Sequence, residues 1–182
     1  MSKLAVIING GGGVGKDTLC DLAAKHFKTV KISTIDPIKK IAAENGWKGE
    51  KTPQARKFLS SLKQVFADYN DLPTEYAVKE YIKFLSPDND REIFFVHIRE
   101  AEQIGHFIER AKHAADTLPS QRDRGRIVTL LVRSLRAKES YGNPSDDDVE
   151  NFRYDYVFTN DLPLDKAETA FAELLNNIIK QG

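Results

Sequence analysis

A run of glycines followed by a lysine is the segment of this sequence whose residue types most clearly imply chemistry. Residues 10–18 read Gly-Gly-Gly-Gly-Val-Gly-Lys-Asp-Thr and fit the G-x-x-x-x-G-K spacing, with an apolar run before them and an amphipathic pattern after them. Glycines permit unusual backbone dihedrals and carry no Cβ, so successive amides can surround a phosphate at the positive end of a helix. The pattern therefore predicts a phosphate cradle whose lysine, Lys16, reaches the β- and γ-phosphates of ATP. The predicted nucleotide-binding residues of the cradle are Gly10, Gly11, Gly12, Gly13, Val14, Gly15 and Lys16.

The two residues after Lys16 depart from the general motif, which has Ser or Thr where this chain has Asp17 and then Thr18. The Gly-Lys-x-Thr form resembles the P-loop of nucleoside monophosphate kinases such as adenylate kinase. Gly-Lys-Asp-Thr looks specifically like the viral-type deoxynucleoside monophosphate kinases. This resemblance implies that Thr18 bonds the α-phosphate of the donor and that both residues lie near Mg²⁺. Alternatively, Asp17 is a first-turn carboxylate favoured by the helix dipole.

Two further segments resemble the acceptor side of the same kinase family. Ser33–Ala42 is similar to the turn and helix start that line the acceptor nucleotide, and there Asp36 and Lys39 are the implied contacts. Ala55–Leu62 is similar to the arginine and Leu-rich helix of the acceptor-binding insert, which makes Arg56 a ligand of the acceptor phosphate. The alternatives are a capped helix start, because Asp36 suits an N-cap, and surface basic residues.

A histidine stands where the family has an aspartate that orients magnesium-bound waters. The family motif is an aspartate, one residue and an arginine; Arg99 matches its arginine, and His97 replaces its aspartate. Magnesium prefers oxygen donors, so His97 is a poor ligand, and Glu100 or Glu102 could supply the carboxylate instead. We therefore predict metal contacts from Asp17, Thr18 and Glu100. The resemblance makes Arg99 both catalytic and acceptor-binding.

Polar residues also follow the last two apolar runs, where ligands bind at the carboxyl ends of strands in open α/β sheets. The family resemblance makes Arg133 and Arg136 catalytic arginines on the donor side, at the root of a short lid at about 137–151. It makes residues 159–161 a turn against the donor base, with Asn160 as the nucleotide-binding residue.

The elements that must position these residues can be identified from hydrophobic patterns. Four of the five β-like runs are nearly continuously apolar, as expected for parallel strands covered on both faces. Helical patterns lie between them and predict a doubly wound, mainly parallel five-stranded α/β sheet of the P-loop NTPase type. One domain would span residues 1–182, with residues 47–90 as a helical acceptor-binding insert. The predicted strands are Leu4–Ile8, Thr29–Ser33, Ile93–Ile98, Ile127–Val132 and Tyr154–Phe158.

Composition narrows the class of protein. The 182 residues include 27 Lys and Arg against 27 Asp and Glu, so no net charge draws the chain to nucleic acid. The single cysteine cannot form an internal disulfide, and no basic and apolar leader opens the chain. No apolar run approaches the roughly 20 residues that cross a bilayer. We therefore expect a cytoplasmic protein with small-molecule partners and without nucleic-acid or membrane partners.

Together these features predict ATP- and Mg²⁺-dependent phosphoryl transfer to a nucleoside or deoxynucleoside monophosphate. Two alternatives stay open at this point. One is a P-loop ATP-binding regulatory module that is not a kinase, which His97 favours. The other is a kinase for another small phosphorylated metabolite, such as a coenzyme precursor. The sequence does not specify the acceptor or the oligomeric state.

Overall fold

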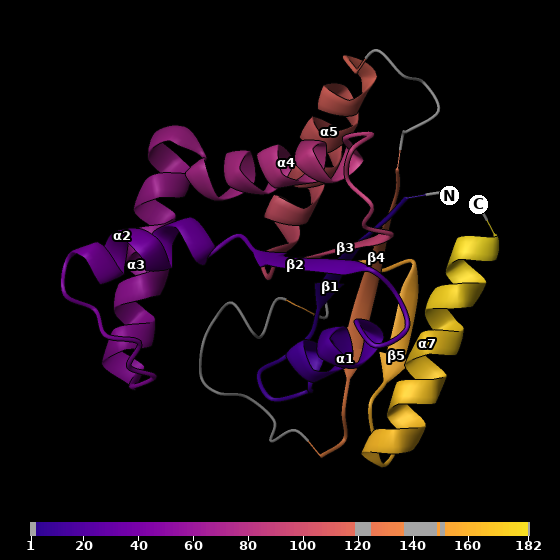
Figure 1. Cartoon of the computed structure of the whole chain (residues 1–182). Coiled ribbons are helices and arrows are strands. Elements are labelled where there is room, and N and C mark those ends of the chain that lie inside the picture. The colour runs from indigo at the N-terminus through magenta and orange to yellow at the C-terminus, as the bar shows by residue number, and fades with distance from the viewer. Residues whose placement is uncertain (1–2, 119–124, 137–148, 150–151, 182) are drawn as a thin grey trace.

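The computed structural model describes residues 3–118, 125–136, 149 and 152–181 (Figure 1). Five strands form one sheet in the order β2-β3-β1-β4-β5, and every neighbouring pair is parallel. The prediction of a parallel five-stranded α/β sheet is therefore confirmed. The strands are β1 (Leu4–Asn9), β2 (Thr29–Ser33), β3 (Ile93–His97), β4 (Arg126–Arg133) and β5 (Tyr156–Thr159).

Helices cover both faces of the sheet because side chains of the central strand alternate between them. On β1, Leu4, Val6 and Ile8 belong to one core cluster, and Ala5 and Ile7 belong to the other. The first cluster includes residues of α1 and α7, and the second includes residues of α4 and α5. The helices are α1 (Lys16–Ala23), α2 (Asp36–Glu44), α3 (Pro53–Asn70), α4 (Leu72–Leu85), α5 (Ala101–Asp116) and α7 (Leu164–Lys180).

The predicted insert at residues 47–90 contains two helices with different surroundings. Helix α4 packs on the sheet through Tyr81 and Phe84, whose rings contact Phe94 of β3. Helix α3 instead shares a small separate core with α2, centred on Ile38 and Leu59. Figure 1 shows α2 and α3 beyond the carboxyl end of β2, away from the sheet. Within residues 47–90, α3 is thus the part that projects from the domain, together with the preceding α2.

Strand β5 begins at Tyr156, two residues later than the sequence pattern indicates. The side chain of Asp155 causes the difference, because its Oδ2 accepts hydrogen bonds from the backbone nitrogen and hydroxyl of Thr129, both at 2.8 Å. The Thr129 nitrogen thus bonds the Asp155 side chain, and the backbone pairing of β4 with β5 begins one residue later, at Leu130 and Tyr156. The predicted lid at about 137–151 lies outside the described residues apart from Val149. None of the helices in the described part of the chain has the length and apolarity to cross a membrane.

Candidate active site

The glycine loop between β1 and α1 has a backbone that only glycine readily adopts. Gly10, Gly13 and Gly15 have φ angles of +145°, +81° and +89°. A Cβ at Gly10 would lie 2.3 Å from the Val132 carbonyl oxygen, and one at Gly15 would lie 2.5 Å from the Asn160 Nδ2. The loop therefore fits tightly against the ends of β4 and β5. No side chain in the described residues caps the start of α1, which leaves its first amides suited to an anion.

Lys16 folds back over the loop that precedes it. Its Nζ donates hydrogen bonds to the carbonyl oxygens of Gly10 and, at 2.8 Å, Gly11. The ammonium group therefore lies against the glycine cradle, at the start of α1. This position suits a lysine that exchanges carbonyl contacts for phosphate oxygens when a nucleotide binds.

Asn9 is a buried polar residue at the end of β1 that the sequence analysis did not identify. Its Oδ1 accepts from the Gly10 nitrogen at 2.8 Å, and its Nδ2 donates to the Arg99 carbonyl at 3.0 Å and to the Tyr154 hydroxyl at 2.8 Å. Tyr154 in turn donates to the Val149 carbonyl at 3.0 Å. Asn9 thus connects the glycine loop to the end of β3 and to the segment before β5. The only signal in the sequence is a polar residue directly before the glycines.

A pocket of about 300 Å³ opens between the glycine loop and the ends of β4 and β5. Asn160 closes one side by donating from Nδ2 to the Val14 carbonyl at 2.8 Å, and the Arg136 guanidinium bonds the Asp161 carbonyl. The backbone nitrogen of Asn160 donates to the Arg133 carbonyl at 2.7 Å, while the Arg133 side chain is exposed. The lining residues are Gly13, Val14, Ser134, Arg136, Asn160, Leu162, Pro163, Leu164 and Ala167.

The carboxylates predicted to bind metal both have basic neighbours. Asp17 is 79% exposed, and its Oδ1 lies 3.5 Å from the Lys31 Nζ. Glu100 accepts a 2.6 Å hydrogen bond from Lys63, which makes it a partner of α3. Thr18 is exposed in the first turn of α1. Within the described residues no group of three or more His, Cys, Asp or Glu side chains could hold a metal ion.

His97 is nearly enclosed beside the glycine loop. Its Nε2 lies 3.9 Å from the Cys20 Sγ and 3.8 Å from the Asp17 Oδ1. Burial lowers the pKa of His97 to about 4, although the Asp17 charge favours the imidazolium; the charges of Lys16, Lys31 and Arg99 act in the same direction as burial. The imidazole is therefore neutral near pH 7. Burial also raises the pKa of Cys20 to about 12, so this thiol is not a nucleophile near neutral pH.

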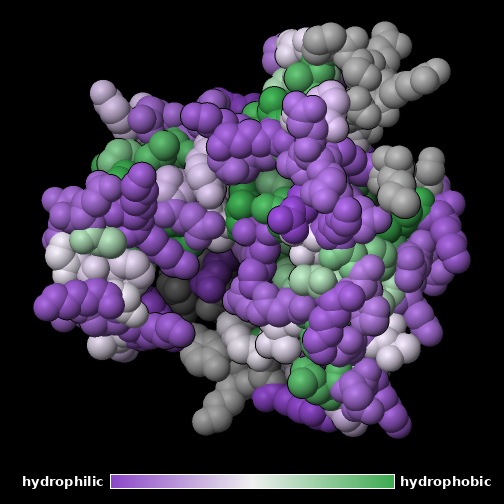
Figure 2. Space-filling view, viewed as in Figure 1, coloured by the Kyte–Doolittle hydropathy of each residue, from purple (hydrophilic) through white to green (hydrophobic). Residues whose placement is uncertain are grey.

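The predicted acceptor-side residues come from three different elements. The Asp36 Oδ2 accepts from the Ser33 nitrogen at 2.7 Å and so stabilises the turn before α2. Lys39 on α2, Arg56 in the first turn of α3 and Arg99 after β3 are all exposed. Figure 2 shows a recess, bordered by hydrophilic side chains, between the α2–α3 pair and the rest of the molecule.

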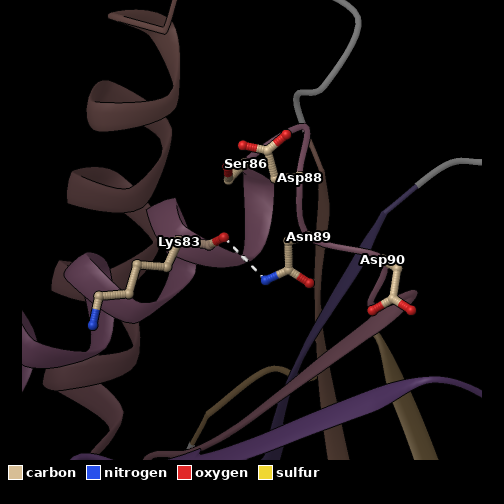
Figure 3. A pocket seen from close by; sticks show the side chains of 5 residues that line it. All are labelled: Lys83, Ser86, Asp88, Asn89 and Asp90. Carbon is tan, nitrogen blue, oxygen red and sulfur yellow. Dashed lines mark hydrogen bonds between the residues drawn. The ribbon is translucent and has the colours of Figure 1, made fainter.

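A larger hollow of about 440 Å³ lies at the opposite edge of the sheet, near the start of β3 (Figure 3). Lys83, Ser86, Asp88, Asn89 and Asp90 line it. The side chain of Lys83 points away from the two aspartates, and the Asn89 amide donates to the Lys83 carbonyl at 3.0 Å. This hollow contains none of the predicted site residues. The glycine loop, the 300 Å³ pocket and the recess beside α2 and α3 therefore define the candidate active site.

No protein-family model and no curated protein matches this chain, but solved structures do. A structure described as a "putative kinase" from Chloroflexus aurantiacus J-10-fl has a TM-score of 0.50 at 13% identity and covers 97% of this chain and 98% of that one. Shikimate kinase from Aquifex aeolicus VF5 has a TM-score of 0.48 at 9% identity, over 98% and 100% of the two chains. A gluconokinase from Sinorhizobium meliloti 1021 has a TM-score of 0.46 at 12% identity, over 100% and 97%.

At these identities structural similarity shows the fold alone, and we base the fold assignment on the first structure because its TM-score reaches 0.50. The chain has a P-loop kinase-like α/β fold with the parallel strand order 2-3-1-4-5.

Proposed function

We propose that this chain transfers the γ-phosphoryl group of ATP to a nucleoside or deoxynucleoside monophosphate. The observation that carries the proposal is the glycine loop, whose positive φ angles and uncapped helix start provide a phosphate cradle. The adjoining pocket of about 300 Å³ supports a nucleotide as the donor, because apolar Leu162 and Leu164 face it together with polar Arg136 and Asn160.

Phosphoryl transfer requires the protein mainly to position groups and to stabilise charge. Lys16 and the loop amides would hold the β- and γ-phosphates of the donor. Arg136 and Arg133 would neutralise charge on the transferred group. Arg99, which follows β3, and Arg56, on α3, would bind the acceptor phosphate through charge-assisted hydrogen bonds.

The oxygen donors beside the cradle fit magnesium, which usually takes one or two protein ligands together with substrate phosphates. The Thr18 hydroxyl and the exposed Asp17 carboxylate are the residues that would hold it, since Glu100 is already paired with Lys63. The metal would neutralise charge on the phosphate oxygens. Asp17 would then exchange its contact with Lys31 for the ion.

One observation favours a second candidate, a P-loop ATP-binding module that regulates a partner without transferring phosphate. His97 is neutral and enclosed at the position where the kinase family has an aspartate, so this position provides no carboxylate for magnesium waters. The exposed arginines Arg56 and Arg99 favour a kinase instead. They would equally suit a different small phosphorylated acceptor, such as a coenzyme precursor.

The test is a panel of nucleoside and deoxynucleoside monophosphates, together with phosphorylated coenzyme precursors, incubated with ATP and Mg²⁺ and resolved by chromatography. We expect an ADP product matched by one phosphorylated acceptor, and neither product from the Lys16→Ala variant. Transfer only to a coenzyme precursor would shift the proposal to the other kinase. ATP binding without transfer to any acceptor would support the regulatory module.

A further inference from the structure

Helix α3 buries a lysine at a position where its neighbours predict an apolar residue. The buried residues of α3 are Leu59 and Lys63, one helical turn apart on the same face. The Lys63 side chain is 8% exposed, and its Nζ lies 2.6 Å from the Glu100 Oε2. Burial lowers the pKa of Lys63, and the charge of Glu100 opposes that effect. The ammonium group is thus held in a largely enclosed place by one carboxylate.

A buried ion pair is weak evidence for stability, because desolvation of the two charges commonly cancels their attraction. An apolar residue such as methionine would fill the same place on α3 at less cost. What the ion pair adds is a fixed geometry between two elements that are far apart in the sequence. It joins the projecting α2–α3 pair to the start of α5, at Glu100.

Glu100 directly follows Arg99, so the ion pair holds the backbone beside the predicted acceptor-binding arginine. On the other side, the Arg99 carbonyl accepts the 3.0 Å hydrogen bond from the Asn9 Nδ2. Two buried polar side chains therefore hold this junction, because Asn9 bonds the Arg99 carbonyl and Lys63 bonds the carboxylate of the next residue. One belongs to the strand that leads into the glycine loop, and the other belongs to α3.

Lys63 also lies close enough to Arg99 for the two charges to interact. Besides Glu100, the charged group that acts on Lys63 is the Arg99 guanidinium, which lowers the pKa of the lysine further. The two basic groups thus lie near each other, and the arginine is the one exposed to solvent. A guanidinium on the surface binds phosphate through charge-assisted hydrogen bonds, which suits the acceptor role proposed for Arg99.

We propose that Lys63 is a positioning residue, which acts through its ion pair with Glu100 to hold Arg99 where the acceptor phosphate meets the donor. This inference rests on the proposed function, because it takes Arg99 as a phosphate ligand. It gives Glu100 a different role from the metal contact that its sequence position implies. It also links the acceptor-side helices to the glycine loop through Lys63, Glu100, Arg99 and Asn9.

The test measures binding of inorganic phosphate, a probe that does not depend on base or sugar, while ADP and Mg²⁺ fill the glycine loop. Trp47 is the only tryptophan and packs against the small α2–α3 core, so its fluorescence reports on this part of the molecule. The variants are Lys63→Met with Glu100→Gln, Arg99→Ala, and all three changes combined. The exposed Lys83–Glu80 pair on α4, changed to Met and Gln, is the matched control.

Removing both partners avoids an unpaired buried charge, so the Lys63→Met, Glu100→Gln variant should stay folded. Circular dichroism checks this. Phosphate affinity should fall about tenfold, as for loss of one charge-assisted contact, while ADP affinity changes less than about twofold. Glu100→Asp, which keeps the charge but shortens the reach, should give a smaller loss. The Lys83→Met, Glu80→Gln control should bind phosphate like the unmodified chain.

The combined variant separates positioning from general stability. If Lys63 acts through Arg99, its removal should cause no further loss of phosphate affinity once Arg99 is alanine. Wild-type phosphate affinity in the Lys63→Met, Glu100→Gln variant, or additive losses in the combined variant, would overturn the inference while leaving the proposed function intact. Unchanged phosphate binding in Arg99→Ala, or none by the unmodified chain, would overturn both the inference and the acceptor role of Arg99. Transfer in the acceptor panel would still test the kinase activity itself.

Discussion

At the scale of single residues, His97 shows how burial decides charge at the site. The positive charges of Lys16, Lys31 and Arg99 lower the pKa of its imidazole, and the negative charge of Asp17 raises it. Burial outweighs the aspartate and lowers the pKa of His97 to about 4. A neutral imidazole neither attracts phosphate nor repels magnesium. The sequence identified the position of His97 but could not predict its charge, which depends on packing against Cys20 and α1.

The low pKa of His97 predicts a loss of stability in mild acid. Between about pH 6.5 and pH 4 the unfolded chain binds a proton at His97 and the folded chain does not, so stability falls as pH falls through this range. The full contribution is about 3 kcal/mol. Urea unfolding at pH 7, 5.5 and 4.5 measures it. His97→Gln should lose less stability across this range than the unmodified chain. Equal losses would contradict the lowered pKa of His97.

Lys16 supports a prediction about activity. Its ammonium group donates to the carbonyls of Gly10 and Gly11 in the loop, so Lys16→Ala should leave the fold intact. The loss of a charged contact to the transferred phosphate should lower kcat/KM for ATP by at least about 100-fold. Steady-state kinetics and circular dichroism check the two parts. Lys25→Ala, a surface change in the turn after α1, is the control, and activity of Lys16→Ala within a few-fold of it would mean that the loop is not the phosphate site.

At the scale of elements, the glycine loop depends on both backbone conformation and space. Gly15 and Gly46 share a positive φ, +89° and +98°, but only Gly15 has a close neighbour, the Asn160 Nδ2. Gly46→Ala should therefore cost only the backbone strain, about 1–2 kcal/mol of unfolding free energy. Gly15→Ala should cost more and should also abolish ADP binding. Chemical denaturation and calorimetric titration measure the two effects, and equal stability losses would show that Asn160 moves aside freely.

The elements themselves were largely predictable because their signals are local. The apolar runs that became β1, β2, β3 and β4 lie within a residue of their predicted ends. The sequence pattern starts strand β5 two residues early. The bond from Thr129 to the Asp155 carboxylate, which shortens the strand, joins residues 26 positions apart and so leaves no local signal. The Lys63–Glu100 pair, 37 positions apart, left no pattern in the sequence for the same reason. Local periodicity predicts elements, whereas contacts between their ends require the folded chain.

At the scale of the whole molecule, the two ends of the parallel strands differ in function: the carboxyl ends form the carboxyl edge of the sheet, and the amino ends form the amino edge. The carboxyl ends of the strands carry the glycine loop, Arg99 and Asn160. Hydrogen bonds join Asn160 to the glycine loop and Arg99 to Asn9 at the end of β1. The amino edge carries Lys3, whose ammonium group joins the end of α4 to the turn before β3. These bonds support the amino ends of the strands, whereas the proposed phosphate sites lie at the carboxyl ends. Stability and activity should therefore respond separately to changes at the two edges.

Lys3 tests this separation. Its Nζ donates to the carbonyls of Phe84, Ser86 and Asn89, at 3.3 Å and 2.7 Å for the last two, and lies 4.9 Å from the centre of the Phe84 ring. The Phe84 and Ser86 carbonyls lie at the end of α4, and the Asn89 carbonyl lies in the turn before β3. The Ser86 carbonyl also accepts from the Asn89 nitrogen at 3.0 Å. Lys3→Met leaves these carbonyls without their charged donor and should lower the unfolding free energy by about 1–3 kcal/mol. The value is measured by urea denaturation.

Lys83→Met is the matched control for this change, because Lys83 forms an exposed ion pair on the same helix and should contribute less than about 0.5 kcal/mol. The kcat/KM of Lys3→Met for ATP should stay within about twofold of the unmodified chain at a temperature where both are folded, since the Lys3 bonds to Phe84, Ser86 and Asn89 lie at the opposite end of the strands from the glycine loop. A loss of kcat/KM without a loss of stability would mean that the amino edge influences the site directly. That result would contradict the division of tasks between the two edges.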